Sequence, residues 1–227
     1  MATTIRTSAP ATRTVERALA LLSVVTESPT SLTECARRTS LPASTALRLL
    51  RTLEASGFAS RDIRGDYGAG PRMIQLGARA VGRHELTRLA RPALDRIVAA
   101  TGESAYLSVR GVGASALYVA QAEGTHAVRH ISWVGRAVGT EGLAIGLVLD
   151  GDVGDSGYVA ERDRQEPDVT AIVAPVWSAG GVIGALSVLG PTYRIDEATM
   201  HRYGETVAAE GIRLSAHFGP TRREDAR

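Results

Sequence analysis

The chain has 227 residues, of which 44% are hydrophobic and 22% charged, enough for two modest domains or one large one. Its single cysteine, Cys35, excludes an internal disulfide framework and a zinc site built from clustered cysteines, and we expect it in the core. No apolar run approaches the roughly 20 residues of a membrane-spanning helix, and no signal-peptide core is present. We therefore expect a cytoplasmic protein with no membrane partner.

The charge is unevenly distributed along the chain. Residues 1–91 hold 14 Arg and 7 acidic residues, whereas residues 92–227 hold 12 Arg and 17 acidic residues. The front part therefore has a net charge of +7 and the back part a net charge of −5. This split fits a nucleic-acid-binding module joined to a part with a different role.

The first 27 residues predict an arm followed by a helix. Residues 1–13 are small, polar and Pro-containing, and we expect them to be disordered. Thr14 is a candidate N-cap of a helix that ends near Glu27, before Ser28 and Pro29. The apolar residues of this helix predict one buried stripe, formed by Val15, Leu19, Leu22 and Val25.

A helix-turn-helix is predicted in the next segment. Ser31 and Glu34 have the spacing of a capping box, which starts a short helix ending near Arg38. A tight connection over residues 39–42 leads directly into a second helix over residues 41–54. Two short helices joined by such a turn are typical of DNA-binding proteins, in which the second helix enters the major groove.

The second helix is amphipathic. Its apolar face has the helical spacing i, i+3, i+4, i+7 and consists of Ala46, Leu49, Leu50 and Leu53. Arginine binds a guanine edge bidentately, while hydroxyls and helix N-termini reach phosphates, so the other face is suited to DNA. The candidate DNA-binding residues on that face are Ser44, Thr45, Leu47, Arg48 and Arg51. An ordinary solvated helix is the alternative.

A β-hairpin is predicted after this helix. Residues 58–61 and 66–69 flank a turn at residues 63–65 that contains glycine. A hairpin directly after a recognition helix is a wing, which would bring Arg61 and Arg64 near phosphates or the minor groove. A solvated hairpin tip is the alternative.

The run from Thr39 to Gly77 resembles the winged helix-turn-helix of IclR-type bacterial transcription regulators. It shares their LP-x-ST-x-x-RLL helix, their L-E-x-x-G-[FY] exit, a short wing and a GPR-x-x-x-LG connector. Similarity to the GAF-like effector domain of these regulators extends the resemblance over about Val15 to Phe218. One departure is Leu47, where the family usually has His, which implies either an altered base preference or a different operator.

The resemblance implies partners and domains. We expect a homodimer, or a dimer of dimers, that binds a double-stranded DNA operator and a small-molecule effector. The expected domains are a winged helix-turn-helix over 14–70, a helical linker and dimerisation segment over 71–91, a GAF-like effector domain over 92–220 and a disordered tail over 221–227.

The back half reads as strands and helices, so the expected fold class is α+β with an antiparallel sheet. In the linker, Gly82 and the pair Arg91-Pro92 predict breaks between at least two helices. We expect strands over 105–109, 116–121, 128–134, 172–177 and 182–188, a short helix within 135–149 and a closing helix over 196–218.

The resemblance also implies an effector pocket between a loop and the sheet. Ala171 stands where many relatives carry Cys, and Leu189 replaces the second Ser of a Ser-x-Ser pair, so we expect a less polar pocket. As alternatives, Ala171, Leu189 and Ile145 are plain core residues, and Arg129 pairs either with a ligand carboxylate or with an internal glutamate. The candidate effector-binding residues are Arg129, His130, Glu141, Ala144, Ile145, Glu161, Ala171, Ser187 and Leu189.

The segment next to this pocket departs from the family pattern. Glu141 stands at the position of a usual His, and Leu147 at the position of a usual Lys. The mostly helical segment that normally follows is reduced to residues 150–156, so one wall of the pocket is altered or shortened.

An enzyme is not expected. The five histidines show no HxH or HExxH spacing for a metal, and Ser187 lies in no GxSxG elbow, so we expect no catalytic residues, metal or cofactor. A regulator without a ligand, whose back half only oligomerises, remains the alternative to a metabolite sensor.

Overall fold

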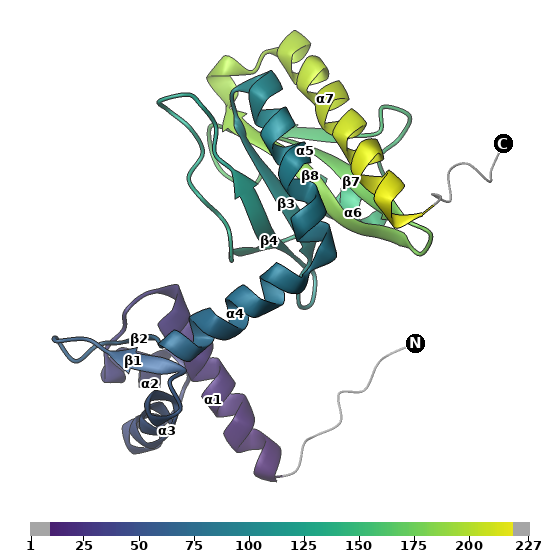
Figure 1. Cartoon of the computed structure of the whole chain (residues 1–227). Coiled ribbons are helices and arrows are strands. Elements are labelled where there is room, and N and C mark those ends of the chain that lie inside the picture. Colours follow the sequence, from purple (N-terminus) through teal and green to yellow (C-terminus); the bar gives the residue numbers. More distant parts are fainter. Residues whose placement is uncertain (1–9, 220–227) are drawn as a thin grey trace. The chain divides into compact units, whose positions relative to one another are not determined.

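The computed structural model describes residues 10–219, with side chains from residue 13, and divides the chain into two compact units that meet between Val81 and Gly82 (Figure 1). Of the arm expected over residues 1–13, residues 1–9 lie outside the described residues. Residues 10–13 belong to the first helix, which begins at Pro10 and not at Thr14. The tail expected over 221–227 also lies outside the described residues.

The first unit is a helix-turn-helix followed by a two-stranded antiparallel wing, as the sequence predicts. Thr30 also pairs with Tyr67 through two backbone hydrogen bonds of 2.9 Å. This pairing fastens the wing to the segment just before the helix that begins at Leu32. The elements of this unit are α1 (Pro10–Glu27), α2 (Leu32–Arg38), α3 (Ala43–Ala55), β1 (Ala59–Arg61), β2 (Tyr67–Ala69) and α4 (Pro71–Arg83).

The buried stripe of α1 is only partly the expected one. Leu22 and Val25 are buried, but Val15 and Leu19 are 57% and 56% exposed. These two side chains line an open apolar groove with Leu49, Leu53 and Phe58, instead of a closed core. The core therefore forms around the C-terminal half of α1, where it packs with α2, α3 and the wing.

The second unit is built on one antiparallel sheet. Within the described residues its strand order is β5-β4-β3-β8-β7-β6, which confirms the predicted α+β class. The elements are α5 (Glu85–Thr101), β3 (Ser104–Arg110), β4 (Ser115–Ala122), β5 (Ala137–Gly139), α6 (Ala144–Asp150), β6 (Val159–Arg162), β7 (Val169–Ser178), β8 (Gly181–Pro191), η1 (Thr192–Arg194), α7 (Glu197–Ser215) and η2 (Ala216–Phe218).

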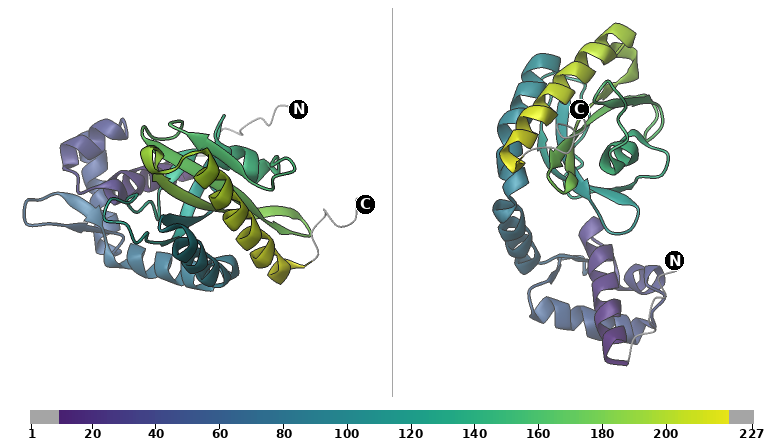
Figure 2. Two further views of the ribbon diagram at one scale, coloured as in Figure 1. Left: turned by 90° about the horizontal axis from the view of Figure 1, so that it is seen from above. Right: turned by 90° about the vertical axis from the view of Figure 1, so that its right-hand side faces the viewer.

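Helices cover the two faces of this sheet unequally. α5 and α7 lie side by side on one face, where they close the largest apolar core (Figures 1 and 2). The short helix α6 lies on the opposite face and packs against β4, β7 and β8 (Figure 2). The region beside α6 is completed by the long β4–β5 connection, and this is the part of the sheet that holds the candidate effector residues.

The strand expected over 128–134 is absent. This segment is irregular, and the third strand is β5, at residues 137–139. His130 and Trp133 are its buried residues, and their side chains hold the loop against the sheet. Such a spacing of three does not suit a strand, in which alternate residues share a face. The short edge strand β6 was not among the expected strands.

The expected break at Arg91-Pro92 is also absent, because α5 runs through it from Glu85. Pro92 and Arg88 are both exposed, so water can bond the carbonyl that the missing N–H leaves free. The helices instead separate at His84, close to the glycine at position 82. The expected linker boundary after residue 91 thus falls inside a continuous helix. Among the described residues, no helix is long and apolar enough to cross a membrane.

Candidate DNA-binding surface and effector site

The turn between α2 and α3 fixes how α3 is presented. Ser31 caps α2 by accepting a hydrogen bond from the Glu34 N–H at 3.3 Å, which is one half of the predicted capping box. The Glu34 carboxylate does not return this bond and instead pairs with Arg37 at 2.7 Å. Ser40 adopts a positive φ of 53°, and the Leu41 N–H then bonds back to α2. This left-handed residue allows the chain to enter α3 after only a few residues.

The two faces of α3 are those that the sequence predicts. All four apolar residues, Ala46, Leu49, Leu50 and Leu53, are buried. Ser44, Arg48 and Arg51 are exposed, whereas Thr45 and Leu47 are half-buried. Within the described part of the chain, the guanidinium groups of Arg48 and Arg51 have no hydrogen-bond or ion-pair partner. The outer side of α3 is a shallow hollow lined by Ser44, Leu47, Arg48, Arg51, Thr52, Ala55 and Ser56.

The wing places its two arginines differently. The Asp62 carboxylate accepts hydrogen bonds from the backbone N–H groups of Arg64 and Asp66, at 2.8 and 2.9 Å, and thereby shapes the turn. Arg61 donates from Nε to the Gly65 carbonyl at 2.9 Å, so its guanidinium serves the hairpin itself. The guanidinium of Arg64 has no partner within residues 10–219. The wing therefore offers Arg64, more than Arg61, to a phosphate.

On the second unit, the α6 side of the sheet brings most of the candidate effector residues together. Glu161 pairs with Ala171, and Ala171 pairs with Leu189 on the next strand. The neighbouring row runs through Ser187 and Tyr106. Directly paired residues point to the same side of an antiparallel sheet. These side chains therefore share one face, and the first turn of α6, with the buried Ala144 and Ile145, packs on the same side.

Four aromatic rings form a closed cluster on this face. Tyr106 meets Tyr118 and His130 edge to face, and Trp133 meets the same two rings, with centroid separations from 4.5 to 5.5 Å. Edge-to-face packing is a favourable arrangement of aromatic rings. Ala171 and Leu189 pack against this cluster. At these two positions this face of the sheet is apolar.

Polar groups nevertheless surround the aromatic cluster. Glu161 accepts a hydrogen bond from the Ala144 N–H at 2.7 Å through Oε2, and burial raises the pKa of this carboxyl. Burial also raises the pKa of Tyr118 to about 12. The buried side-chain atoms that lack a hydrogen-bond partner in this region are Ser108 Oγ, His130 Nε2, Trp133 Nε1, Glu161 Oε1, Gln165 Nε2, Glu166 Oε2 and Ser187 Oγ.

Two expected effector residues do not join this group. Arg129 is exposed and lies 3.4 Å from the Glu123 carboxylate, so it pairs with neither Glu141 nor Glu161. Glu141 is exposed in the loop before α6.

Four residues of this face were not predicted from the sequence: Tyr106, Tyr118, Trp133 and Glu166. An available signal was the placement of Tyr106 and Ser108 at alternate positions of one strand, which puts both on one face. Glu166 had no such signal, because it lies in a loop whose path depends on the pairing of β6 with β7.

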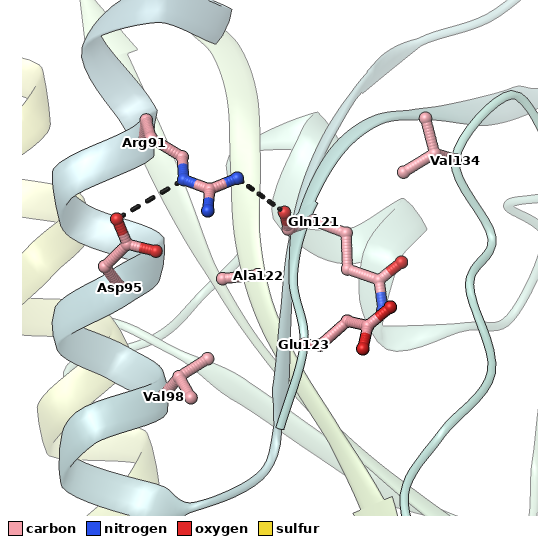
Figure 3. Close-up of a pocket in the computed structure, with 7 residues that line it drawn as sticks. All are labelled: Arg91, Asp95, Val98, Gln121, Ala122, Glu123 and Val134. Atoms are coloured by element: carbon pink, nitrogen blue, oxygen red, sulfur yellow. Dashed lines mark hydrogen bonds and ion pairs between the residues drawn. The ribbon is translucent and has the colours of Figure 1, made fainter. Parts of the chain in front are cut away.

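A second hollow lies between α5 and β4. Figure 3 shows Arg91 reaching from α5 to Asp95, at 3.3 Å, and to the Gln121 carbonyl of β4, at 3.4 Å. Glu123 and Val134 complete the far wall (Figure 3). Arg91 and Glu123 already form ion pairs with other residues. We therefore assign the charged residues around this hollow a structural role at the edge of the sheet.

A helix-turn-helix with a wing, joined to an α+β unit, defines a DNA-binding transcription regulator. Residues 14–62 match the model of the IclR helix-turn-helix domain, and residues 78–150 and 152–216 match the model of the C-terminal domain of bacterial IclR transcriptional regulators. The chain belongs to the IclR family, as its resemblance implied.

Individual relatives agree with this assignment. The chain is 29% identical to the HTH-type transcriptional regulator BhcR of Paracoccus denitrificans, over 94% of this chain and 89% of the relative. A crystal structure of an IclR regulator from Alicyclobacillus acidocaldarius superposes with a TM-score of 0.78 at 26% identity, over 94% of this chain and 100% of that one. An IclR homolog from Microbacterium hydrocarbonoxydans, complexed with 4-hydroxybenzoate, has a TM-score of 0.73 at 23% identity, over 90% and 98%. These proteins are regulators and not enzymes.

Proposed function

We propose that this regulator binds a pseudo-palindromic operator with the outer face of α3 in the major groove. The observation that carries the proposal is a pair of exposed arginines, Arg48 and Arg51, without internal partners on a helix whose other face is fully buried. Ser44, Thr45, Leu47 and Arg48 face bases or the nearest phosphates, and Arg51 faces the backbone. Arg64 adds a phosphate contact from the wing. We propose the cytoplasm as its location, because an operator lies on chromosomal DNA.

The operator geometry follows from the assembly that we propose, a dimer or a dimer of dimers. α4 supports it, because the helix has no buried residue and exposes the apolar side chains of Ile74, Leu76 and Val81. Exposed apolar surface of this kind marks a protein–protein contact. A two-fold dimer presents two copies of α3, which read half-sites about 10–10.5 base pairs apart, or a multiple of that spacing.

Sequencing the genomic fragments that the purified protein captures tests this function. We expect a two-fold symmetric motif, and genes beside it would indicate the pathway under control. Capture of fragments that share no motif would contradict sequence-specific regulation.

We infer that the α6 side of the second unit binds a small effector. The buried polar atoms without partners support this inference, because an unmade hydrogen bond inside a protein costs about 1–3 kcal/mol and a ligand can recover it. The 4-hydroxybenzoate complex of a protein with the same fold is consistent with a small-molecule site in this family. The effector couples to α3 through residues 71–91, provided that its affinity differs between two arrangements of the DNA-binding units.

Thermal unfolding tests effector binding. A ligand at 100 times its Kd adds about 2.7 kcal/mol to the stability of the unit that binds it. Failure of a broad metabolite screen to shift the unfolding temperature would favour the alternative in which this unit only oligomerises. The short connection between α6 and β6 supports that alternative, because it shortens one wall of the expected pocket.

A further inference from the structure

We propose that the effector is a small organic cation, a protonated amine or amidine, bound between Glu161 and Glu166 beside the aromatic cluster of Tyr106, Tyr118, His130 and Trp133. This inference rests on the proposed effector-binding function and specifies its ligand class. Three features of the site support it: the positions of the hydrogen atoms on His130 and Tyr106, the two carboxylates, and the aromatic rings.

The hydrogen-bond network assigns the tautomer of His130. The Tyr106 hydroxyl donates its only hydrogen to the Ile131 carbonyl at 2.7 Å. Its oxygen lies 2.8 Å from His130 Nδ1, so this nitrogen must be the donor of the second bond. Burial lowers the pKa of His130, which favours the neutral ring. Nε2 of the neutral ring is therefore a hydrogen-bond acceptor.

This acceptor faces another acceptor. Glu166 Oε2 lies 3.4 Å from His130 Nε2, a contact that is an ion pair when the ring is protonated; with the neutral ring, neither atom has a hydrogen-bond partner among the described residues. Two lone pairs at this separation lack the hydrogen that would join them. Both atoms are inaccessible to water in this structure, so an ammonium reaches them only when the neighbouring side chains move apart; it can then donate to both, because an ammonium has three donors and no acceptor.

The charge of the site also favours a cationic ligand. Glu161 retains an unpartnered Oε1 beside the first turn of α6, so the cluster is flanked by two carboxylates. The arginines that approach this region are exposed and engaged: Arg164 donates to the Gly142 carbonyl, and Arg136 lies over Trp133 at 4.4 Å. Burial raises the pKa of Glu161, so ionising this carboxyl is unfavourable in the folded protein, and a cation beside it would offset that cost.

The aromatic rings suit such a ligand as well. Ring faces attract cations, and aromatic groups around an ammonium are a recurrent mode of recognition. An anionic ligand would meet two carboxylates and these negative ring faces. The unpartnered Trp133 Nε1 and Gln165 Nε2 are donors, so the ligand also presents an acceptor such as a hydroxyl or carbonyl oxygen.

Matched probes that differ only in charge test the ligand class. The full-length protein is titrated with benzylamine, benzyl alcohol and benzoate, and with butylamine, butanol and butyrate, while thermal unfolding is followed. We expect the amines alone to raise Tm, by about 5 °C or more near saturation. Stabilisation by the carboxylates would overturn the cation assignment while leaving effector binding intact. No shift with any probe would overturn the proposal, and operator capture would show whether regulation itself stands.

Variants and a direct probe of His130 complete the test. Glu161→Gln and Glu166→Gln should each lower amine affinity at least tenfold, whereas Glu141→Gln, an exposed carboxylate in the loop before α6, should leave it unchanged. Glu161→Gln keeps an oxygen that can accept the Ala144 N–H, so the fold is retained. The ¹⁵N shifts of His130 without ligand should show Nε2 unprotonated. A doubly protonated ring would instead form an ion pair with Glu166 and would contradict the proposal.

Discussion

The Glu161 carboxylate accepts a hydrogen bond from the Ala144 backbone N–H at 2.7 Å, and this contact joins β6 to the first turn of α6. Burial is the main cause of the raised pKa of Glu161, so the folded state prefers the protonated form more than the unfolded chain does. The contribution of this group to stability is therefore complete below its unfolded pKa and is lost as the pH rises through its folded pKa.

Glu161→Gln should remove this dependence. As the pH rises from the unfolded pKa of this glutamate through its raised folded pKa, the wild-type protein should lose stability relative to the variant, because the glutamine does not ionise. Urea unfolding at several pH values measures the difference between the two free energies of unfolding. A difference that stays constant with pH would show that Glu161 ionises as freely in the folded protein as in the unfolded chain.

Substitution of the two wing arginines should have different effects, one on DNA affinity and the other on the stability of the first unit. Arg64→Ala should weaken binding to all DNA sequences alike and lower the salt slope by about one, with stability changed by less than about 0.5 kcal/mol. Arg61→Ala should instead destabilise the first unit by about 0.5–1.5 kcal/mol, because it removes the bond to the Gly65 carbonyl. Salt-dependent fluorescence anisotropy and urea unfolding measure the two effects. Equal salt slopes for both variants would show that the guanidinium of Arg61 leaves the hairpin on binding.

The Tyr106 hydroxyl should contribute to stability through its two partners. Tyr106→Phe leaves His130 Nδ1 and the Ile131 carbonyl without this oxygen, and we expect a loss of about 1–3 kcal/mol. Tyr193→Phe is the matched control, because Tyr193 is 75% exposed and should change stability little. Equal effects of the two substitutions in urea unfolding would contradict the importance of this network.

Self-association through α4 is tested by a single charge. Ile74→Arg places a guanidinium on an exposed apolar position and should shift the protein toward monomers in analytical ultracentrifugation. Gln75→Arg adds the same charge on the adjacent, polar side of α4 and should leave the oligomer unchanged. If both variants remain as associated as the wild type, the subunits associate through another surface.

The sequence predicted best those features that local signals determine. The capping serine at position 31, the apolar spacing of α3 and the glycine-containing turn of the wing each act within a few residues, and all three lie where expected. The hairpin of β7 and β8 and the closing helix α7 were predictable for the same reason. Features that depend on contacts between residues far apart in the sequence were not predictable in this way.

The irregular segment from 128 to 134 shows why. Its apolar residues suggested a strand, but Trp133 and His130 are held by aromatic rings from β3 and β4, which no local pattern reveals. Val15 and Leu19 fit the helical period of α1, yet their side of the helix borders an open groove. The candidate effector set was likewise incomplete, because Glu166 enters the site only through the fold of its loop.

The affinity of Arg48→Ala for a captured operator fragment and for its single-base variants is the most direct test of the proposed binding mode. If Arg48 reads a base from the outer face of α3, the substitution should cost roughly 1–3 kcal/mol per site and abolish discrimination at one position of each half-site. Arg88→Ala, an exposed arginine on α5, should bind as the wild type does. Unchanged affinity and unchanged sequence preference for Arg48→Ala would show that α3 does not read DNA with this face.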